Sequence, residues 1–208
     1  MRQNRSLKKE ETVRIIKDSE AMAISKIYGF ETKYPIGMHL SRHCLNMTIP
    51  DYVNFLKEFA YDSFILLNRK NHLKRVISMQ RGRSSGIWHT MNASRKIDKV
   101  HINPMNFEVG LDINMTLVDY FRKLDIQREQ VLNSLGNCSL LNLDYEADVS
   151  DSPMVGYRKI CEFMGVVPLK PDIKLKKTNP FPASELVSNF EEVAQCLDNT
   201  PYAWMLYE

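Results

Sequence analysis

The sequence has no long run of apolar residues. Nowhere among its 208 residues is there a stretch approaching the roughly 18–20 consecutive apolar positions that a membrane-spanning helix needs. Residues 1–11 are polar and charged, and no apolar stretch follows them, so we expect no secretory signal peptide. We therefore expect a cytoplasmic protein without a membrane span.

Cysteine and candidate metal ligands are also sparse. The four cysteines are widely spaced and form no C-x-x-C pair; they are Cys44, Cys138, Cys161 and Cys196. This spacing is typical of buried thiols in a reducing compartment. His39 and His43 are four residues apart beside Cys44, but no carboxylate or second cysteine is in register with them. We therefore expect no bound metal.

An excess of glycine or proline, low-complexity segments and a large net charge are absent as well. The chain has 8 Gly and 9 Pro, and 28 basic against 25 acidic residues give a net charge of +3. These values exclude the fibrous and disordered classes, and a hydrophobic content of 44% is enough for one sizeable core. Because no repeat or linker divides the chain, we predict a single domain over residues 1–208.

What the sequence does contain is an alternation of apolar runs and amphipathic segments. The apolar runs predict strands at residues 63–68 and 139–146, and we expect the first strand to be covered on both faces. Periodicity and end signals predict helices at residues 6–27, from near Pro50, from near His72, at 115–135, from Pro153 to Gly165 and at 184–197. This order favours an α/β fold with a mainly parallel central sheet flanked by helices.

The junction between the first strand and the next helix is the most informative segment. In open α/β sheets, ligands bind beyond the carboxyl ends of the strands, and a helix N-terminus there offers free N–H groups to an anion. Arg69 ends the strand, and Ser78 lies about two turns into the helix, so both side chains are candidates for holding one phosphate. The alternative interpretation is a basic helix start that only faces solvent.

At these residues the chain resembles sulfotransferases that use 3′-phosphoadenosine 5′-phosphosulfate. Their 3′-phosphate motif is a strand ending in arginine, a turn, and a helix that carries a serine; here these are Arg69 and Ser78, nine residues apart. This spacing is similar to that of the bacterial carbohydrate branch, the trehalose sulfotransferase-like enzymes. The similarity continues through residues 78–89, 143–146, 161–165 and 189–192. It covers roughly residues 60–208 in all.

The resemblance implies a fold, a co-substrate and a reaction. The fold would be the P-loop-like sulfotransferase fold, and the co-substrate would be 3′-phosphoadenosine 5′-phosphosulfate, with no metal. A sulfuryl group would pass to a hydroxyl of a carbohydrate or glycolipid. Arg69 and Ser78 would hold the 3′-phosphate, and a late basic loop with Lys174, Lys176 and Lys177 would come over it.

Several of these residues have a second interpretation. Trp88 and His89 either line the acceptor pocket or, for the tryptophan, anchor a loop to the core. The late lysines either contact phosphate or form a solvated surface run. Glu146 ends the second strand like the family's Tyr-Glu pair, and we interpret it as structural, capping or orienting a neighbouring loop.

One part of the family pattern is not found. The Gly/Ser/Thr-rich loop that cradles the 5′-phosphosulfate normally precedes these motifs, but residues 1–60 contain only Gly29 and Gly37 and no such turn. The segment 81–86 is basic and glycine-containing, yet it follows a helix instead of a strand, which is the wrong order for a phosphate loop. We expect an N-terminally incomplete domain that transfers sulfate poorly, and the catalytic base stays unknown.

The rival hypothesis is a non-catalytic nucleotide- or nucleic-acid-binding protein that uses the basic patch 69–83. This patch has six cations: Arg69, Lys70, Lys74, Arg75, Arg81 and Arg83. Such clusters contact phosphates. Because no interleaved aromatic residues or nucleic-acid motif accompany them, we expect no nucleic-acid partner. Lys74 is expected on an outer face of the helix.

Overall fold

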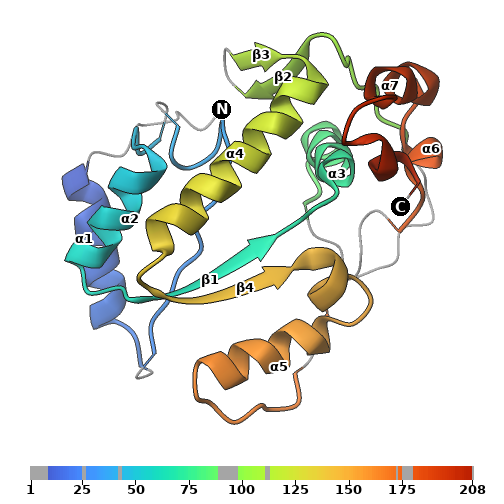
Figure 1. Ribbon diagram of the computed structural model, residues 1–208. Helices are drawn as coiled ribbons and strands as arrows, with labels where there is room; N and C mark the ends of the chain where they lie inside the picture. Colours follow the sequence, from blue (N-terminus) through green and yellow to red (C-terminus); the bar gives the residue numbers. More distant parts are fainter. Residues whose placement is uncertain are drawn as a thin grey trace. The chain divides into compact units, whose positions relative to one another are not determined.

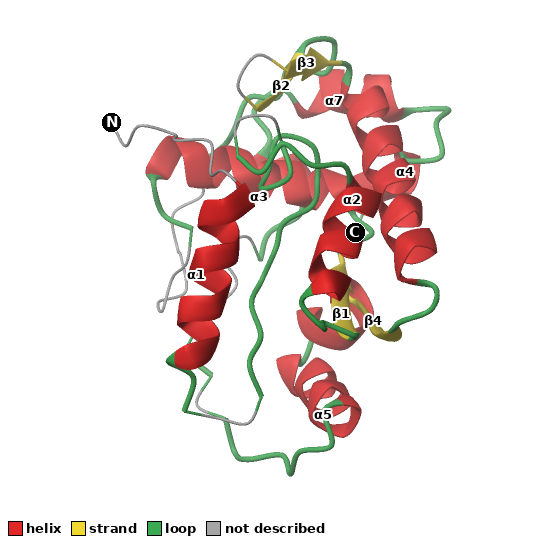
Figure 2. Cartoon of the chain, turned by 90° about the vertical axis from the view of Figure 1, so that its left-hand side faces the viewer, coloured by secondary structure: helices red, strands yellow, loops and turns green. Residues whose placement is uncertain are grey.

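The computed structural model describes residues 9–24, 27–41, 44–88, 98–110, 113–171, 173–174 and 180–207. The chain forms two compact units: residues 1–62, 108–114 and 122–138, and residues 63–107, 115–121 and 139–208. Helix is the main secondary structure of both (Figure 2). Within the described ranges, no helix combines the length and the apolar composition needed to span a membrane. Two compact units can belong to one domain, so the single-domain prediction stays a prediction.

In the first unit, α1 spans Lys9–Ala21 and α2 spans Ile49–Glu58. Thr48 caps α2, since its hydroxyl accepts the N–H of Asp51 at 3.2 Å, and Pro50 lies in the first turn, where no N–H is needed. The helix predicted to begin near Pro50 is thus confirmed. α1 ends before the predicted residue 27.

The first unit also contains most of α4, which spans Leu117–Leu135. Its apolar side in this unit is buried at Leu124, Val131 and Leu135. Lys57 of α2 donates to the carbonyl of Ser134 near the end of α4 at 3.1 Å. Two short strands that the sequence did not predict, β2 (Phe107–Gly110) and β3 (Ile113–Met115), pair with each other before α4 begins.

The sheet of the second unit consists of parallel strands. β1 spans Ser63–Asn68 and β4 spans Ser139–Asp144, and they pair from Ser63 opposite Ser139 to Asn68 opposite Asp144 (Figure 1). Among the described residues this sheet has no third strand. The predicted α/β class and parallel pairing are therefore confirmed, with a sheet of two strands. Both carboxyl ends lie at the same edge, which brings the segments after them together.

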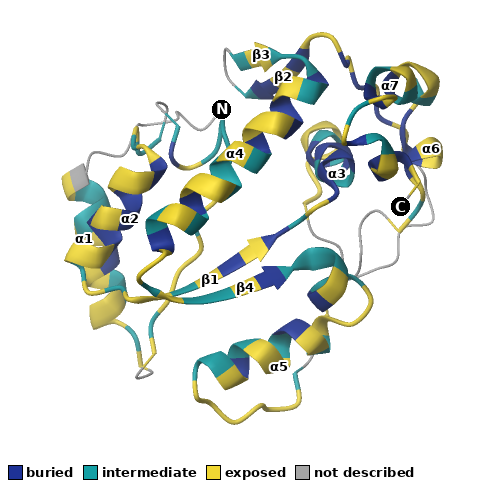
Figure 3. Ribbon diagram, in the orientation of Figure 1, coloured by how far each residue is buried: buried dark blue, intermediate teal, exposed yellow. Residues whose placement is uncertain are grey.

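β1 is covered on one face only. Leu66 and Asn68 are buried, whereas Ile65 and Leu67, which alternate with them, are 43% and 52% exposed (Figure 3). Successive side chains of a strand point to opposite faces, so the exposed pair defines one open, apolar face. The prediction that both faces are covered is wrong. A continuous apolar run looks the same in the sequence whether one face or two are buried.

α3 spans His72–Ser85 and provides much of the core of the second unit. Its buried side chains include Leu73, Val76 and Ile77. Gly86 follows in a left-handed conformation (φ 70°), and its N–H donates to the carbonyl of Gly82 at 3.0 Å. The loop predicted from residue 81 therefore begins later, because residues 81–85 are still helical.

After β4 comes a π-helical segment, η1 (Tyr145–Ser150), so the predicted strand 139–146 is two residues shorter. α5 spans Pro153–Phe163, with the proline in its first turn, and Gly165 follows with a left-handed φ of 64°. Both ends agree with the prediction.

The helix predicted at 184–197 is two helices, α6 (Ala183–Leu186) and α7 (Phe190–Leu197). Val187 between them pairs in parallel with Val100. The side chain of Asn189 accepts the N–H of Ile102 at 3.0 Å and donates to its carbonyl at 2.7 Å, which continues this pairing.

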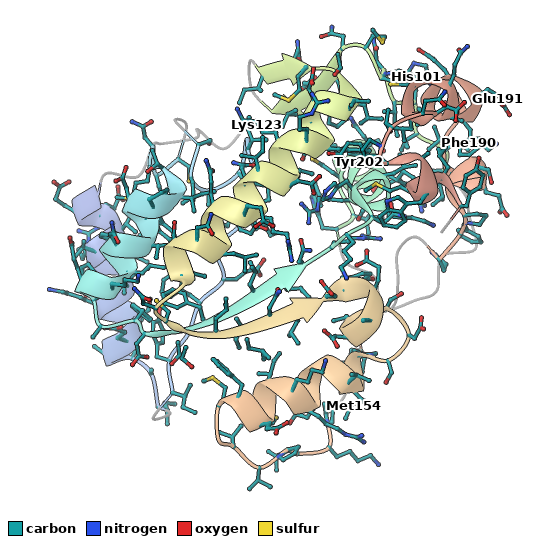
Figure 4. The ribbon with its side chains drawn as sticks, viewed as in Figure 1. His101, Lys123, Met154, Phe190, Glu191 and Tyr202 are labelled. Carbon is teal, nitrogen blue, oxygen red and sulfur yellow. The ribbon has the colours of Figure 1, made fainter. Side chains whose placement is uncertain are left out.

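The chain then forms a 3₁₀ helix, η2 (Ala203–Leu206), which the sequence did not predict. Just before it, Tyr202, labelled in Figure 4, packs edge-on against Phe121 with ring centroids 5.4 Å apart. The residues after α7 thus belong to the core of the second unit.

Candidate anion site at the carboxyl ends of the parallel strands

Arg69 lies at the carboxyl end of β1, as predicted. Its guanidinium carbon is 4.6 Å from the ring centroid of Tyr145, the first residue after β4, so a cation–π contact fixes one side of the group. The Nε atom is buried and has no hydrogen-bond partner. Among the described residues, no carboxylate forms an ion pair with this guanidinium.

The electrostatic environment of Arg69 follows from this packing. Burial lowers the pKa of the guanidinium, while the nearby Tyr145 and Glu146 raise it and Arg75 lowers it further. An arginine stays charged in proteins, so Arg69 is a largely buried cation. Such a group is stabilised by an anion, and a guanidinium is well shaped to bind the oxygens of a phosphate or sulfate.

The turn between β1 and α3 is already occupied by a carboxylate. Glu146 accepts the N–H of Lys70 through Oε2 and the N–H of Asn71 through Oε1, both at 3.0 Å. The expectation of free N–H groups for an anion at this turn is therefore wrong for these two groups. The interpretation of Glu146 as a structural residue that orients a neighbouring loop is confirmed.

Asn71 holds the start of α3 in place. Its Oδ1 accepts the N–H of Lys74 at 2.8 Å, which caps the helix, and its Nδ2 donates to the carbonyl of Met205 at 3.2 Å. The side chain is almost fully buried, at 2% exposure. The N–H of Lys74, in the first turn of α3, is thus also taken.

Three of the six cations of the basic patch have oxygen partners within the second unit. Lys70 pairs with Asp144 at 2.7 Å, Lys74 donates to the carbonyl of Phe181 at 2.5 Å, and Arg75 donates to the carbonyl of Arg69 at 3.3 Å. The prediction that Lys74 lies on an outer face of the helix is therefore wrong. These bonds place the cations in internal contacts, and they leave Arg69 as the cation without an oxygen partner among these four.

Ser78 lies in α3 and is half-buried. No hydrogen bond joins its hydroxyl to Arg69 in the described part of the chain. The structure thus puts both residues in one unit, on the strand end and the following helix, without a direct bond between them. Their joint role in binding a phosphate stays a prediction.

Trp88 packs against α3. A Cβ atom added at Gly82 would lie 2.5 Å from Cε3 of the indole, so only glycine permits this contact. The residue is nevertheless 55% exposed. Trp88 therefore anchors the segment after α3 while a large part of its surface stays accessible.

The proposed substitute cradle at residues 81–86 is not a loop. Residues 81–85 belong to α3, and the hydroxyls of Ser84 and Ser85 donate to the carbonyl of Arg81 at 3.2 and 2.7 Å. Four other predicted site residues lie outside the described residues: His43, His89, Lys176 and Lys177. Lys174 is exposed, and the Nδ1 atom of His39 accepts the N–H of Lys33 at 3.1 Å.

A second carboxylate after β4 was missed by the sequence analysis. Asp148 in η1 is buried; its Oδ2 accepts the N–H of Asp144 at 2.9 Å and its Oδ1 pairs with Lys159 of α5 at 2.7 Å. The hydrogen bond from Lys159, then the one from Asp144, lower the pKa of this carboxyl, against the raising effect of burial. The only signal in the sequence is a run of acidic residues after a strand.

The candidate site is therefore Arg69, which contacts the ring of Tyr145 and follows β1 at a turn whose N–H groups are bound by the carboxylate of Glu146. In the described part of the chain, no group of three or more His, Cys, Asp or Glu side chains is arranged to hold a metal. Neither a protein-family model, nor a curated protein, nor a solved structure matches the chain.

Proposed function

We propose that the second unit binds the 3′-phosphate of 3′-phosphoadenosine 5′-phosphosulfate through Arg69, as part of a carbohydrate sulfotransferase. The observation that carries this proposal is a largely buried arginine without a carboxylate partner at the carboxyl edge of two parallel strands. Ligands of open α/β sheets bind at that edge. The resemblance of residues 69–78 to the family's 3′-phosphate motif supports the identity of the ligand.

The reaction would be an in-line transfer of a sulfuryl group. The bond between sulfur and the donor's phosphate oxygen breaks, a bond to an acceptor hydroxyl oxygen forms, the hydroxyl proton leaves to a base, and adenosine 3′,5′-bisphosphate is released. Like phosphoryl transfer, this chemistry depends on positioning and on stabilising charged oxygens. Arg69 would contribute by fixing the end of the donor remote from the reacting sulfur.

The internal contacts of the basic patch argue against the nucleic-acid rival. Binding to a polyanion uses several exposed cations that release counterions together. Here Lys70, Lys74 and Arg75 have oxygen partners within the unit. One largely buried guanidinium is better matched to one phosphate group of a small ligand than to an extended backbone.

Calorimetry with adenosine 3′,5′-bisphosphate and 5′-AMP tests the proposal. The wild-type protein should prefer the 3′-phosphorylated nucleotide, and Arg69→Ala should weaken its binding about ten- to a hundredfold, since bonds to charged groups are worth roughly 1.5–3 kcal/mol. Ser78→Ala should cost less, nearer to about tenfold, because the hydroxyl is neutral. Arg158→Ala, on the exposed side of α5, is the matched control and should change nothing.

Three results would contradict the proposal. They are equal affinity for the two nucleotides, an Arg158 effect as large as that of Arg69, and submicromolar, sequence-selective binding of RNA or DNA at physiological salt. The last would favour the nucleic-acid rival. Because Lys74 has an internal bond to Phe181, its substitution is not a suitable control.

A further inference from the structure

The loop after α5 presents apolar side chains to solvent. Val167 is 83% exposed and Leu169 is 76% exposed, and Pro168 lies between them. The loop runs back along α5 on the side of that helix that faces away from β4 (Figures 1 and 2). Single exposed apolar residues are common, but two such highly exposed side chains within three residues are not explained by packing within the unit.

The backbone of this loop is held in place. The N–H of Val166 donates to the carbonyl of Cys161 at 2.9 Å, and the N–H of Leu169 donates to the hydroxyl of Tyr157 in α5 at 3.0 Å. The side chains of Val167 and Leu169 therefore stay exposed although the chain that carries them is anchored. Their exposure is therefore set by the hydrogen-bonded backbone of the loop.

Positively charged residues follow these apolar residues in the sequence. Lys170 follows Leu169 directly, Ile173 is exposed, and Lys174 comes next and is also exposed. Over residues 166–177 the sequence has four lysines against one aspartate. Apolar side chains flanked by lysines match the border between acyl chains and anionic headgroups, where the apolar groups enter the membrane and the cations contact phosphates.

We propose that the loop of residues 166–171 docks the protein on an anionic lipid surface. Val167 and Leu169 enter the interfacial layer, and Lys170 faces the lipid phosphates. The charge complementarity favours an anionic bilayer as the occupant of this surface. The inference does not depend on Arg69, but it fits an acceptor that is itself held in a membrane.

Co-sedimentation with vesicles tests the docking. The wild-type protein is mixed with phosphatidylcholine vesicles and with vesicles that also contain about one third phosphatidylserine, at low and at high salt. We expect binding to the anionic vesicles at low salt, weaker binding at high salt, and little binding to the neutral vesicles. The double variant Val167→Ser, Leu169→Ser should bind about tenfold or more weakly, and Lys170→Gln about fivefold more weakly.

Met105→Ser is the matched control, because Met105 is also a highly exposed apolar residue of the second unit. It should bind vesicles like the wild type, and circular dichroism should show that all variants are folded. The proposal is overturned if the wild type does not bind anionic vesicles at low salt, which would leave an acidic protein as the better partner. Equal effects of the Met105 and Val167–Leu169 substitutions would overturn it too.

Discussion

The two parallel strands end in opposite charges. β1 is followed by Arg69 and Lys70, whereas β4 ends in Asp144 and is followed within two residues by Glu146. Because the strands are parallel, these ends meet at one edge, and the acidic end supplies partners to the basic one: Asp144 pairs with Lys70, and Glu146 accepts two N–H groups of the turn. Of the two cations that follow β1, Arg69 is the one without an oxygen partner among the described residues.

This difference shows how a turn can be formed before any ligand arrives. A strand-to-helix turn has N–H groups that need acceptors, and an exposed turn would obtain them from water or from a bound anion. Here a carboxylate fixes the turn, so the backbone is preorganised and a ligand would contact an arginine that is already in place. Substitutions at the basic and at the acidic end should therefore have separate effects.

Replacing Asn71, whose side chain caps α3 and binds the carbonyl of Met205, should have the largest effect on stability. Asn71→Ala loses the helix cap and leaves the carbonyl of Met205 without its donor, so the free energy of unfolding should fall by about 3 kcal/mol. Urea unfolding measures this. Asn71→Ser keeps an acceptor for the cap and should lose only about 1 kcal/mol. Equal losses for both variants would show that the cap does not matter.

Glu146→Ala tests the acidic end. It removes the acceptor of two backbone N–H groups, and water replaces part of the loss, so we expect the free energy of unfolding to fall by about 2 kcal/mol. Glu146→Gln keeps one oxygen acceptor and should lose about half as much. An unchanged stability of Glu146→Ala would mean that the turn does not need its carboxylate.

Asp148 should make the stability of the protein depend on acidic pH. Its pKa is lower in the folded state than the ordinary value of 3.8, so its contribution is complete above that value and is lost as pH falls through the folded pKa. Urea unfolding between about pH 5 and about pH 2 should therefore show falling stability. Asp148→Asn should flatten this part of the curve, and a slope equal to that of the wild type would contradict the assignment.

The ion pair between Lys70 and Asp144 should matter least. Its side chains are 54% and 27% exposed, and exposed ion pairs are worth about 0–1 kcal/mol. Lys70→Ala should therefore lower the free energy of unfolding by less than about 1 kcal/mol, and salt should reduce the difference. A larger loss would show that this pair, and not Glu146, joins the two strand ends.

The elements that the sequence predicted correctly are those with local causes. The apolar run 63–68 predicted β1, Thr48 and Pro50 marked the start of α2, and Gly165 marked the end of α5. One prediction that failed depended on a contact between distant segments: the helix 184–197 is interrupted where Val187 pairs with Val100. The other concerned a boundary, since α3 continues past residue 81 and ends only before the left-handed Gly86.

The residues of the candidate site likewise divide into those that a local pattern predicts and those that only a distant contact brings into place. Arg69 at a strand end before a helix could be found from the sequence, because strand, turn and cap are properties of neighbouring residues. The sequence by itself determined these elements and the charges at their ends. Only the tertiary structure decided that Glu146, 76 residues beyond Lys70, fills the turn and that Tyr145 covers Arg69. Parallel pairing brings those residues together, and no local pattern encodes which carboxylate meets which N–H group.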